Sequence, residues 1–257
     1  MESKDQLGRI HHFDKIPSRI VSLVPSQTEL LVDLGLREQV VGITKFCVHP
    51  TDLKQQKTIV GGTKNVKIDK ISALKPDIVI ANKEENTQQI VAALETIAPV
   101  WVSDINSVKD SLNFIGAMGA LFGREEQAAD LIRAIETARR DFKGYIDDKP
   151  ALKTAYLIWK SPYMVAGHNT FIGDLLRENG FENIVSDPNG RYPEVDLKTL
   201  QQADQIFLSS EPYPFKEKDR AELEAQLGVT VKLVDGEYFS WYGSRLGQAY
   251  EYFKRLH

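Results

Sequence analysis

The sequence predicts an α/β protein of two Rossmann-like lobes with mostly parallel sheets, joined by one long α-helix. Three observations indicate this fold class. Short apolar runs alternate with helical patterns along most of the chain, an order typical of parallel sheets with helical crossovers. One unbroken helical pattern spans residues 124–146, near the middle of the chain. The chain after this helix also repeats the order of elements that precedes it.

The central helix is predicted because small and apolar residues recur at the spacing of one helical face. These residues are Ala128, Leu131, Ile132, Ile135, Ala138, Phe142 and Ile146. Gly123 precedes the pattern, and a turn containing Pro150 ends it. At about 1.5 Å per residue, the helix would be about 35 Å long, roughly the height of a small domain. We therefore expect an N-terminal lobe over 1–123, a connecting backbone helix over 124–148 and a C-terminal lobe over 149–257.

The repeat is indicated by matching residues in the two lobes. The pairs that share a separation of 127 positions are Asp69 with Asp196, Asp77 with Asp204, and Glu84 with Glu211. Each lobe has a short helix and then a buried strand at these positions. A strand, a loop and a helix ending near glycine precede them, and a further strand ending in Asp follows. This shared order predicts one architecture used twice.

The loops that follow the predicted strands are rich in aromatic and charged side chains. Ligands of parallel sheets bind beyond the carboxyl ends of the strands, so we expect a ligand cleft between the lobes. Aromatic rings bury a large area with little loss of entropy, which suits a flat, partly apolar ligand. The candidate ligand-binding residues are Phe46, His49, Lys64, Lys83, Glu84, Tyr163, Tyr192, Glu211, Tyr213, Phe215, Tyr238, Trp241, Tyr242 and Arg245.

The charged candidates have structural alternatives. Lys45, Lys64 and Lys83 follow three successive strand ends and could pair with an anionic ligand. Glu84 and Glu85 could instead neutralise these lysines in ion pairs. In the C-terminal lobe, Glu211 could latch a closed state or be solvated. The alternative for Arg245 is an ion pair with Asp235 or Glu237.

Cys47 and His49 are candidate metal ligands, because thiolate and imidazole suit soft transition metals. Glu84, Glu85 or His168 would have to complete such a site, and the alternative is a packed cysteine beside a loop histidine. A Cys47-dependent enzyme is a further alternative, although near neighbours on an extended segment point to opposite faces. No GxSxG, Walker A or GxGxxG pattern is present. We therefore expect a binding protein that is not an enzyme.

Composition and the N-terminal sequence limit the partners and the location. The net charge of −4 argues against nucleic acid or an anionic membrane as the main partner. The N-terminal stretch 1–19 is polar and lacks an apolar run of signal-peptide length, and we expect His11 and His12 within it to be solvated. These features predict a cytoplasmic monomer. A periplasmic or cell-surface protein without its leader would give the same pattern.

Several segments together resemble one family over nearly the whole chain. They are residues 19–23 with Thr28 and Glu29, residues 40–43, residues 74–80, residues 175–183, and Tyr192 with Pro193. This ordered set resembles the substrate-binding proteins of ABC importers for cobalamin, siderophores and metal chelates, the helical backbone metal receptor superfamily. It is most similar to the cobalamin-binding branch. The resemblance implies a receptor that captures a bulky metal chelate between its lobes, a corrinoid, a ferric siderophore or haem, and delivers it to a permease.

The resemblance also implies roles for individual residues. Asp69 stands where the N-terminal lobe presents an acidic residue to the permease. The matching C-terminal position holds Lys198, with Asp196 nearby as the second docking candidate. The corrin-packing aromatic of the N-terminal lobe is replaced by Thr63, whereas that of the C-terminal lobe is kept as Tyr192. The chelate would be a bound ligand and not an intrinsic cofactor. Lys198 and the polar N-terminus favour an alternative, a cytosolic corrinoid or metal-chelate carrier or sensor without a permease.

Overall fold

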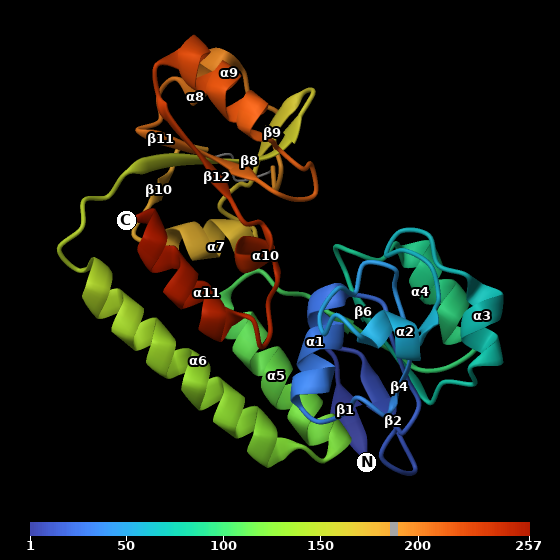
Figure 1. Ribbon diagram of the computed structural model, residues 1–257. Coiled ribbons are helices and arrows are strands. Elements are labelled where there is room, and N and C mark those ends of the chain that lie inside the picture. The colour runs from blue at the N-terminus through green and yellow to red at the C-terminus, as the bar shows by residue number, and fades with distance from the viewer. Residues whose placement is uncertain (186–189) are drawn as a thin grey trace. The chain divides into compact units, whose positions relative to one another are not determined.

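The computed structural model of the protein describes residues 1–185 and 190–257 (Figure 1). Its chain divides into two compact units. The first comprises Met1–Asp104, Lys109–Ile135 and Tyr242–Arg245, and the second comprises Ile105–Val108, Glu136–Trp241 and Leu246–His257. Each unit contains one sheet that is mostly or entirely parallel. The prediction of an α/β protein with two Rossmann-like units is confirmed.

The first unit is built on a five-stranded parallel sheet in the order β5-β4-β3-β6-β7. Its strands are β3 (Ile20–Ser22), β4 (Val40–Ile43), β5 (Thr58–Ile59), β6 (Ile78–Asn82) and β7 (Val100–Ser103). Its helices are α1 (Pro25–Asp33), α2 (Leu53–Gln56), α3 (Ile68–Ala73), α4 (Gln88–Glu95) and most of α5 (Val108–Phe122). Strands β3, β6 and β7 are fully buried, which explains their continuous apolar runs. The strand order reverses between β3 and β6, the place where open parallel sheets bind ligands.

The polar N-terminal stretch forms an antiparallel hairpin of β1 (Glu2–Lys4) and β2 (Ile10–His12). Within it the buried carboxylate of Asp5 accepts a hydrogen bond from Arg9 Nε at 2.7 Å and lies 3.3 Å from His11 Nε2. The His11 side chain is only 12% exposed, whereas that of His12 is 77% exposed. The expectation of a solvated residue is therefore wrong for His11, because Asp5 holds its ring against the unit.

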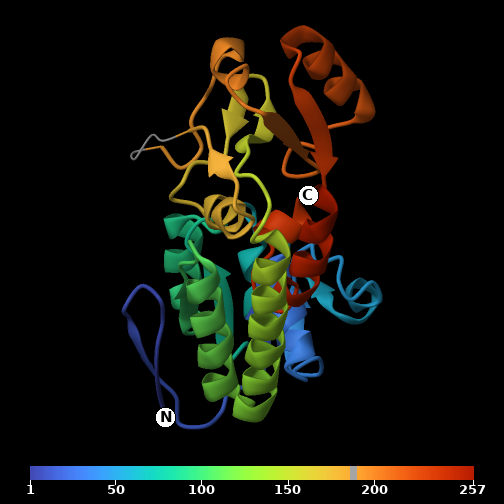
Figure 2. The ribbon, with the colours of Figure 1, turned by 90° about the vertical axis from the view of Figure 1, so that its left-hand side faces the viewer.

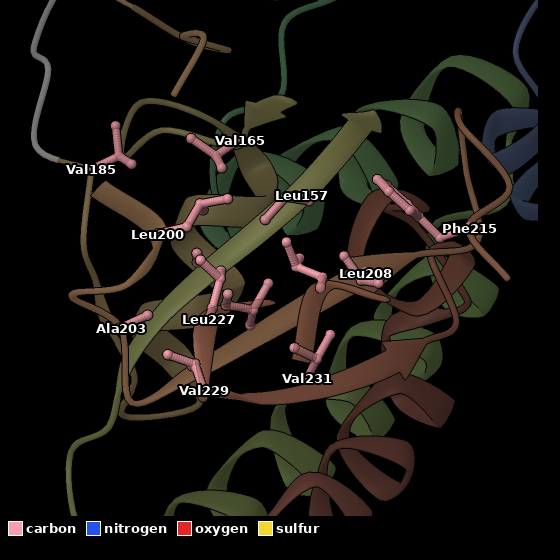
Figure 3. Close-up of a cluster of buried hydrophobic side chains, with 13 residues drawn as sticks. Leu157, Val165, Val185, Leu200, Ala203, Leu208, Phe215, Leu227, Val229 and Val231 are labelled. Atoms are coloured by element: carbon pink, nitrogen blue, oxygen red, sulfur yellow. The ribbon is translucent and has the colours of Figure 1, made fainter. Parts of the chain in front are cut away.

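The second unit has a parallel sheet in the order β10-β8-β11-β12, and β9 pairs antiparallel with β8. Its strands are β8 (Lys153–Lys160), β9 (Tyr163–Val165), β10 (Glu182–Asn183), β11 (Gln205–Ser209) and β12 (Thr230–Val234). Its helices are α7 (Phe171–Glu178), α8 (Leu197–Leu200), α9 (Glu217–Leu227), α10 (Glu237–Ser240) and α11 (Leu246–Phe253), followed by a 3₁₀ turn, η1 (Lys254–Leu256). A core cluster that includes Leu157, Leu208 and Phe215 packs on this sheet (Figure 3).

The predicted central helix is confirmed as α6, the 22 residues Glu125–Ile146. Ala128, Ile135 and Phe142 on its predicted apolar face are buried. Its residues up to Ile135 belong to the first unit and the rest to the second. In the first unit α5 and α6 lie side by side (Figure 2) and approach closely at Gly119, where an added Cβ would lie 2.5 Å from the Cβ of Ala128.

The two sheets confirm the predicted repeat. Strands β6 and β11 correspond at both ends, since Ile78 matches Gln205 and Asn82 matches Ser209 at the predicted separation. The order β4-β3-β6-β7 in the first unit corresponds to β10-β8-β11-β12 in the second. Each unit therefore has an equivalent carboxyl edge, from which its variable loops extend.

Candidate functional site

In the first unit, the loop after β6 is fixed by Asn82. Its Oδ1 accepts hydrogen bonds from the backbone N–H groups of Glu84 at 2.8 Å and Glu85 at 3.1 Å. The backbone N–H of Asn82 donates to Asn86 Oδ1 at 2.9 Å, and Asn86 Nδ2 donates to the carbonyl of Thr63 at 2.9 Å. These bonds connect the loop after β6 to the loop before α3. Such side-chain-to-backbone bonds hold a turn without regular secondary structure.

Three predicted charged residues lie on this edge. The ammonium of Lys64 donates to the backbone carbonyl of Glu84, and that of Lys83 forms an ion pair with Asp104 at 2.6 Å. Burial raises the pKa of the Glu85 carboxyl, an effect that the positive charge of Lys64 opposes. The lysines are thus anchored on the edge by contacts with the chain, and the ammonium of Lys64 is held by a carbonyl oxygen.

Phe46 is the exposed aromatic side chain of this edge. Its ring is 49% exposed, and the ammonium of Lys45 lies 4.9 Å from the ring centroid. Gly62 lies against the ring, because a Cβ at that position would be 3.2 Å from Phe46 Cε2. Cation–π attraction and this close backbone contact hold the ring on the loop after β4. One unburied ring face is therefore presented beside a positive charge.

Cys47, next to Phe46, is fully buried. Its Sγ lies 3.2 Å from the hydroxyl of Thr28 and 3.4 Å from that of Thr44. Burial raises the pKa of the thiol, although these hydrogen bonds oppose the rise. Thiolate is the form that attacks substrates and binds metals, so this environment favours the less reactive thiol. Across residues 1–185 and 190–257, no three or more His, Cys, Asp or Glu side chains are grouped to hold a metal ion.

Tyr242 and Arg245 lie in the interior of the first unit. The hydroxyl of Tyr242 accepts a hydrogen bond from Gln27 Nε2 at 3.0 Å. Arg245 binds Glu29 of α1 through two hydrogen bonds, of 3.0 Å from Nε and 2.7 Å from Nη2. Both side chains of this ion pair are nearly buried, at 7% and 13% exposed. The structure therefore gives Arg245 a partner that we had not expected, Glu29 of α1.

In the second unit, Glu211 occupies the position equivalent to Glu84. Its backbone N–H donates to Ser209 Oγ at 3.3 Å. Its carboxylate accepts hydrogen bonds from the hydroxyl of Ser240 and, at 3.1 Å, from Trp241 Nε1. Burial raises the pKa of this carboxyl, an effect that the hydrogen bond from Ser240 opposes and the negative charge of Glu237 strengthens. Glu211 and Trp241, both predicted to bind the ligand, thus bind each other within one unit.

Three aromatic candidates of the second unit differ in how deeply their side chains are buried. Phe215 is buried in the core cluster, with 5% of its surface exposed (Figure 3). Tyr213 packs edge-on against Phe215, with ring centroids 4.7 Å apart, and is partly buried. Tyr163 of β9 is also partly buried against the same cluster. Tyr213 and Tyr163 therefore lie at the margin between the core and the surface.

The remaining aromatic candidates are each beside a further aromatic or cationic group. The guanidinium of Arg191 lies 5.9 Å from the ring centroid of Tyr192, and its Nη1 donates to Asn106 Oδ1 at 2.5 Å. Tyr238 stacks on Tyr252 with centroids 4.6 Å apart. Tyr192 is thus placed by an arginine that is itself held within the second unit, whereas Tyr238 packs on helix α11.

One exposed aromatic residue was missed by the sequence analysis. Trp159, near the end of β8, is 41% exposed and contacts the ring of Tyr213 with centroids 5.6 Å apart. The sequence signal for Trp159 was its position near the carboxyl end of an apolar run, where ligands of parallel sheets bind.

The two docking candidates lie at the N-terminal ends of short helices. Asp69 is exposed in the first turn of α3. Asp196 is exposed at the start of α8, where its Oδ1 accepts hydrogen bonds from the backbone N–H of Thr199 at 2.8 Å and from its hydroxyl at 2.7 Å. Asp196 also lines a depression of about 670 Å³, whose other lining residues are Pro162, Ile184, Val185, Pro193, Glu194, Val195 and Thr199.

Two α/β units with equivalent parallel sheets, one connecting helix and variable loops at the strand ends define the class of two-lobed solute-binding proteins. Sequence comparison agrees with this class. The chain belongs to the periplasmic binding protein family, whose profile matches residues 20–227. This family consists of solute-binding proteins, and the expectation that the protein is not an enzyme is confirmed.

The relatives are moderately similar. YvrC of Bacillus subtilis, an ABC transporter substrate-binding lipoprotein, is 28% identical over 184 residues, which cover 68% of this chain and 58% of that protein. The chain thus spans little more than half the length of YvrC. A vitamin B12-binding protein of Pectobacterium atrosepticum is 26% identical over 245 residues, 90% of this chain and 85% of that protein. A periplasmic haem-binding protein of Pseudomonas aeruginosa has the same fold, with a TM-score of 0.81 at 20% identity over 93% of this chain and 92% of that chain.

The expectation of a cytoplasmic location is wrong. One relative is a lipoprotein and a structural neighbour is periplasmic, which indicates an extracytoplasmic location. The polar N-terminal stretch on which the expectation rested folds as the β1–β2 hairpin of the first unit. None of the helices within the described residues has the length and apolar character needed to cross a membrane.

Proposed function

We propose that this protein captures a bulky metal chelate and delivers it to the permease of an ABC importer. The proposed ligand class comprises corrinoids such as cobalamin, haem and ferric siderophores. Relatives that bind vitamin B12 or haem support this class. The chelate is the transported ligand and not a resident cofactor.

The observation that carries the proposal is the pair of equivalent carboxyl edges with complementary chemistry. The first edge presents Phe46 beside the ammonium group of Lys45, and it also carries Lys64, whose ammonium donates to the carbonyl of Glu84. The second presents partly exposed aromatic rings, including Tyr213 and Tyr163. A metal chelate combines apolar ring or ligand surfaces with acidic groups, and aromatic faces together with lysines suit both. Each unit contributes one such edge.

Delivery requires a contact with the permease, for which Asp69 and Asp196 are the proposed residues. Both are exposed carboxylates at the N-terminal ends of helices, Asp69 in the first turn of α3 and Asp196 at the N-cap of α8. A carboxylate on a surface pairs with arginine through charge-assisted hydrogen bonds. Asp196 uses one oxygen to cap α8, so its other oxygen remains for this contact. We propose that the protein acts as a monomer and has no nucleic-acid partner.

The test begins with the protein purified from its native host, whose absorption spectrum and metal content identify a bound corrin, haem or ferric siderophore. The ligand-free protein is then titrated with haemin, cyanocobalamin and a ferric hydroxamate siderophore. We expect one of these to bind. A Phe46→Ala variant should bind it about tenfold more weakly, since a stacked aromatic ring contributes on the order of 1 kcal/mol.

A Tyr145→Ala variant is the matched control, because Tyr145 is an exposed aromatic residue of α6, 41% exposed, which contacts Lys254 and His257. It should bind with unchanged affinity. Failure of the native protein to carry or bind any of these chelates would overturn the proposed function.

A further inference from the structure

Trp159 lies where β8 extends beyond its neighbour. The pairing of β11 with β8 ends at Leu157, so the last residues of β8 extend past this pairing and are paired with β9 alone. The register of β8 with β9 also shifts between Leu157 and Trp159. Irregularities of this kind bend a strand and redirect the following side chain, often next to a binding site. Strand β8 adjoins β11 at the reversal of strand order, the ligand-binding position of this type of sheet.

The three tryptophans differ sharply in exposure. Trp101 is fully buried and Trp241 is 7% exposed, whereas Trp159 is 41% exposed. The Nε1–H of Trp101 and that of Trp241 each donate a hydrogen bond, to Ser3 and to Glu211. Trp159 is therefore the tryptophan of this chain whose ring is open to a partner from solution.

Contacts between the rings of Trp159, Tyr213 and Phe215 hold Trp159 in place. Its ring meets Tyr213 at 71° with centroids 5.6 Å apart, and Tyr213 meets the buried Phe215 at 63° with centroids 4.7 Å apart. The backbone N–H of Tyr213 donates to the carbonyl of Ile158 at 3.3 Å, which attaches the loop to β8. Phe215, the innermost of these three rings, belongs to the core cluster (Figure 3). Because folding already orders these rings, binding on Trp159 loses little conformational entropy.

The surroundings of the exposed ring are apolar. Met164 lies opposite Trp159 in the β8–β9 hairpin, and Tyr213 contacts its ring. The nearest cation on the strand, Lys160, is held by Asp219 and by Glu222. No described ion pair or hydrogen bond thus covers the ring, and the chemistry fits a flat, apolar or conjugated surface.

We infer that Trp159 is a specificity-determining residue that stacks on the planar face of the ligand, with Tyr213 as its positioning residue. This inference rests on the proposed function and refines it, since it favours a macrocycle such as a haem or a corrin over a compact ferric hydroxamate. It adds to the second unit a stacking residue that is separate from Tyr192.

The test compares affinities for haemin and cyanocobalamin, followed by absorbance, in the full chain. Trp159→Leu should weaken binding of the macrocycle about tenfold, and Trp159→Phe, which retains a ring, by about threefold or less. Tyr145→Leu, an exposed aromatic substitution on α6, should leave the affinity unchanged. Wild-type affinity in Trp159→Leu would overturn the inference while the proposed function stands. Failure of the wild-type protein to bind any chelate would overturn both.

A second measurement needs no variant. N-bromosuccinimide oxidises exposed indoles, and mass spectrometry of the peptides locates the modified tryptophan. In the ligand-free protein, Trp159 should be oxidised first, and bound haemin or cyanocobalamin should slow its oxidation at least fivefold. An unchanged rate of oxidation in the fully loaded protein would contradict stacking on Trp159.

Discussion

Strands β6 and β11 end at equivalent residues, and both use the side chain of the last residue to start the following loop. Asn82 Oδ1 accepts a hydrogen bond from the N–H of Glu84, two residues later, at 2.8 Å. Ser209 Oγ accepts one from the N–H of Glu211, also two residues later, at 3.3 Å. Beyond this shared turn the two edges differ. The first edge has lysines and an asparagine network, and the second has aromatic rings around a buried carboxyl.

The difference shows which parts of a duplicated architecture are constrained. A loop leaving a parallel strand needs an acceptor for its first N–H groups, and either an amide or a hydroxyl meets this need. The residues further along the loop are not constrained by the turn. Their chemistry can therefore differ between the units while the strands and the turn remain equivalent.

A second comparison concerns two ion pairs, one in each unit. In each pair an arginine donates two hydrogen bonds to a helical glutamate. In the first unit Arg245 binds Glu29 of α1, with both side chains at most 13% exposed. In the second Arg139 binds Glu178 of α7, but Arg139 is 31% exposed and Lys143 lies 3.9 Å from the same carboxylate. The first pair is the more deeply buried of the two.

The largest effect is expected when this first pair is broken. Arg245→Met should lower the free energy of unfolding by about 3–5 kcal/mol, because it leaves the charge of Glu29 buried without a partner. Arg139→Met should cost only about 1–2 kcal/mol, since Lys143 remains near Glu178 and water reaches the pair. Urea unfolding followed by circular dichroism measures both. A Glu29→Gln/Arg245→Met double variant should recover most of the loss, and equal costs for the two single variants would contradict the comparison.

A smaller effect is expected at the shared turn. Asn82→Ala should lower the free energy of unfolding by about 2–3 kcal/mol, because the side chain bonds to two N–H groups and also donates to Ser103. Ser209→Ala should cost about 1 kcal/mol. Asn82→Ser gives the first unit the hydroxyl acceptor that Ser209 provides in the second, so the turn should be retained. The loss in free energy of unfolding should therefore lie between these values. If Asn82→Ser were as destabilising as Asn82→Ala, the two turns would not be equivalent.

The smallest effect is expected at Glu211 and depends on pH. Burial raises its pKa in the folded protein, so the folded state retains this proton to higher pH than the unfolded chain. Its contribution to stability is therefore greatest below about 4.5, the ordinary pKa of a glutamate, and is lost as pH rises through the raised value. Glu211→Gln cannot ionise, but its amide oxygen can accept from Ser240 and Trp241. The melting temperature of this variant should exceed that of the wild type at pH 7.5, with the difference shrinking toward pH 4.

The counterpart of this test in the first unit is Glu85→Gln. The pKa of Glu85 is also raised by burial, but the positive charge of Lys64 favours its ionised form. The pH-dependent difference should therefore be smaller than for Glu211→Gln. A difference in melting temperature that is constant between pH 4 and pH 7.5 would show that neither carboxyl is linked to folding.

Much of the fold could be predicted from the sequence because its signals are local. The apolar spacing of α6 and the buried run of β6 follow from neighbouring residues, and the repeat is visible in the separation of Asp77 and Asp204. The β1–β2 hairpin could not be predicted in this way. Its stability depends on contacts such as that of Arg9 with the carbonyl of Val100, which lies 91 positions away.

The candidate site was predicted less completely, because an aromatic or charged residue after a strand has the same sequence pattern whether it lies in the core or on the surface. Arg245 is buried by a glutamate 216 positions away, which no local pattern reveals. Trp159 shows the opposite case. It ends an apolar strand pattern that is otherwise buried, whereas its own side chain, next to a register shift, is 41% exposed.

The short segment Tyr242–Arg245 has a consequence for biosynthesis. It supplies interior side chains to the first unit, although the residues on both sides of it belong to the second. A ribosome that has released the first 135 residues has therefore not yet made everything that the N-terminal unit needs. That unit becomes complete only when Tyr242–Arg245 has emerged, so a nascent or truncated product that stops before Tyr242 should remain a target for proteases.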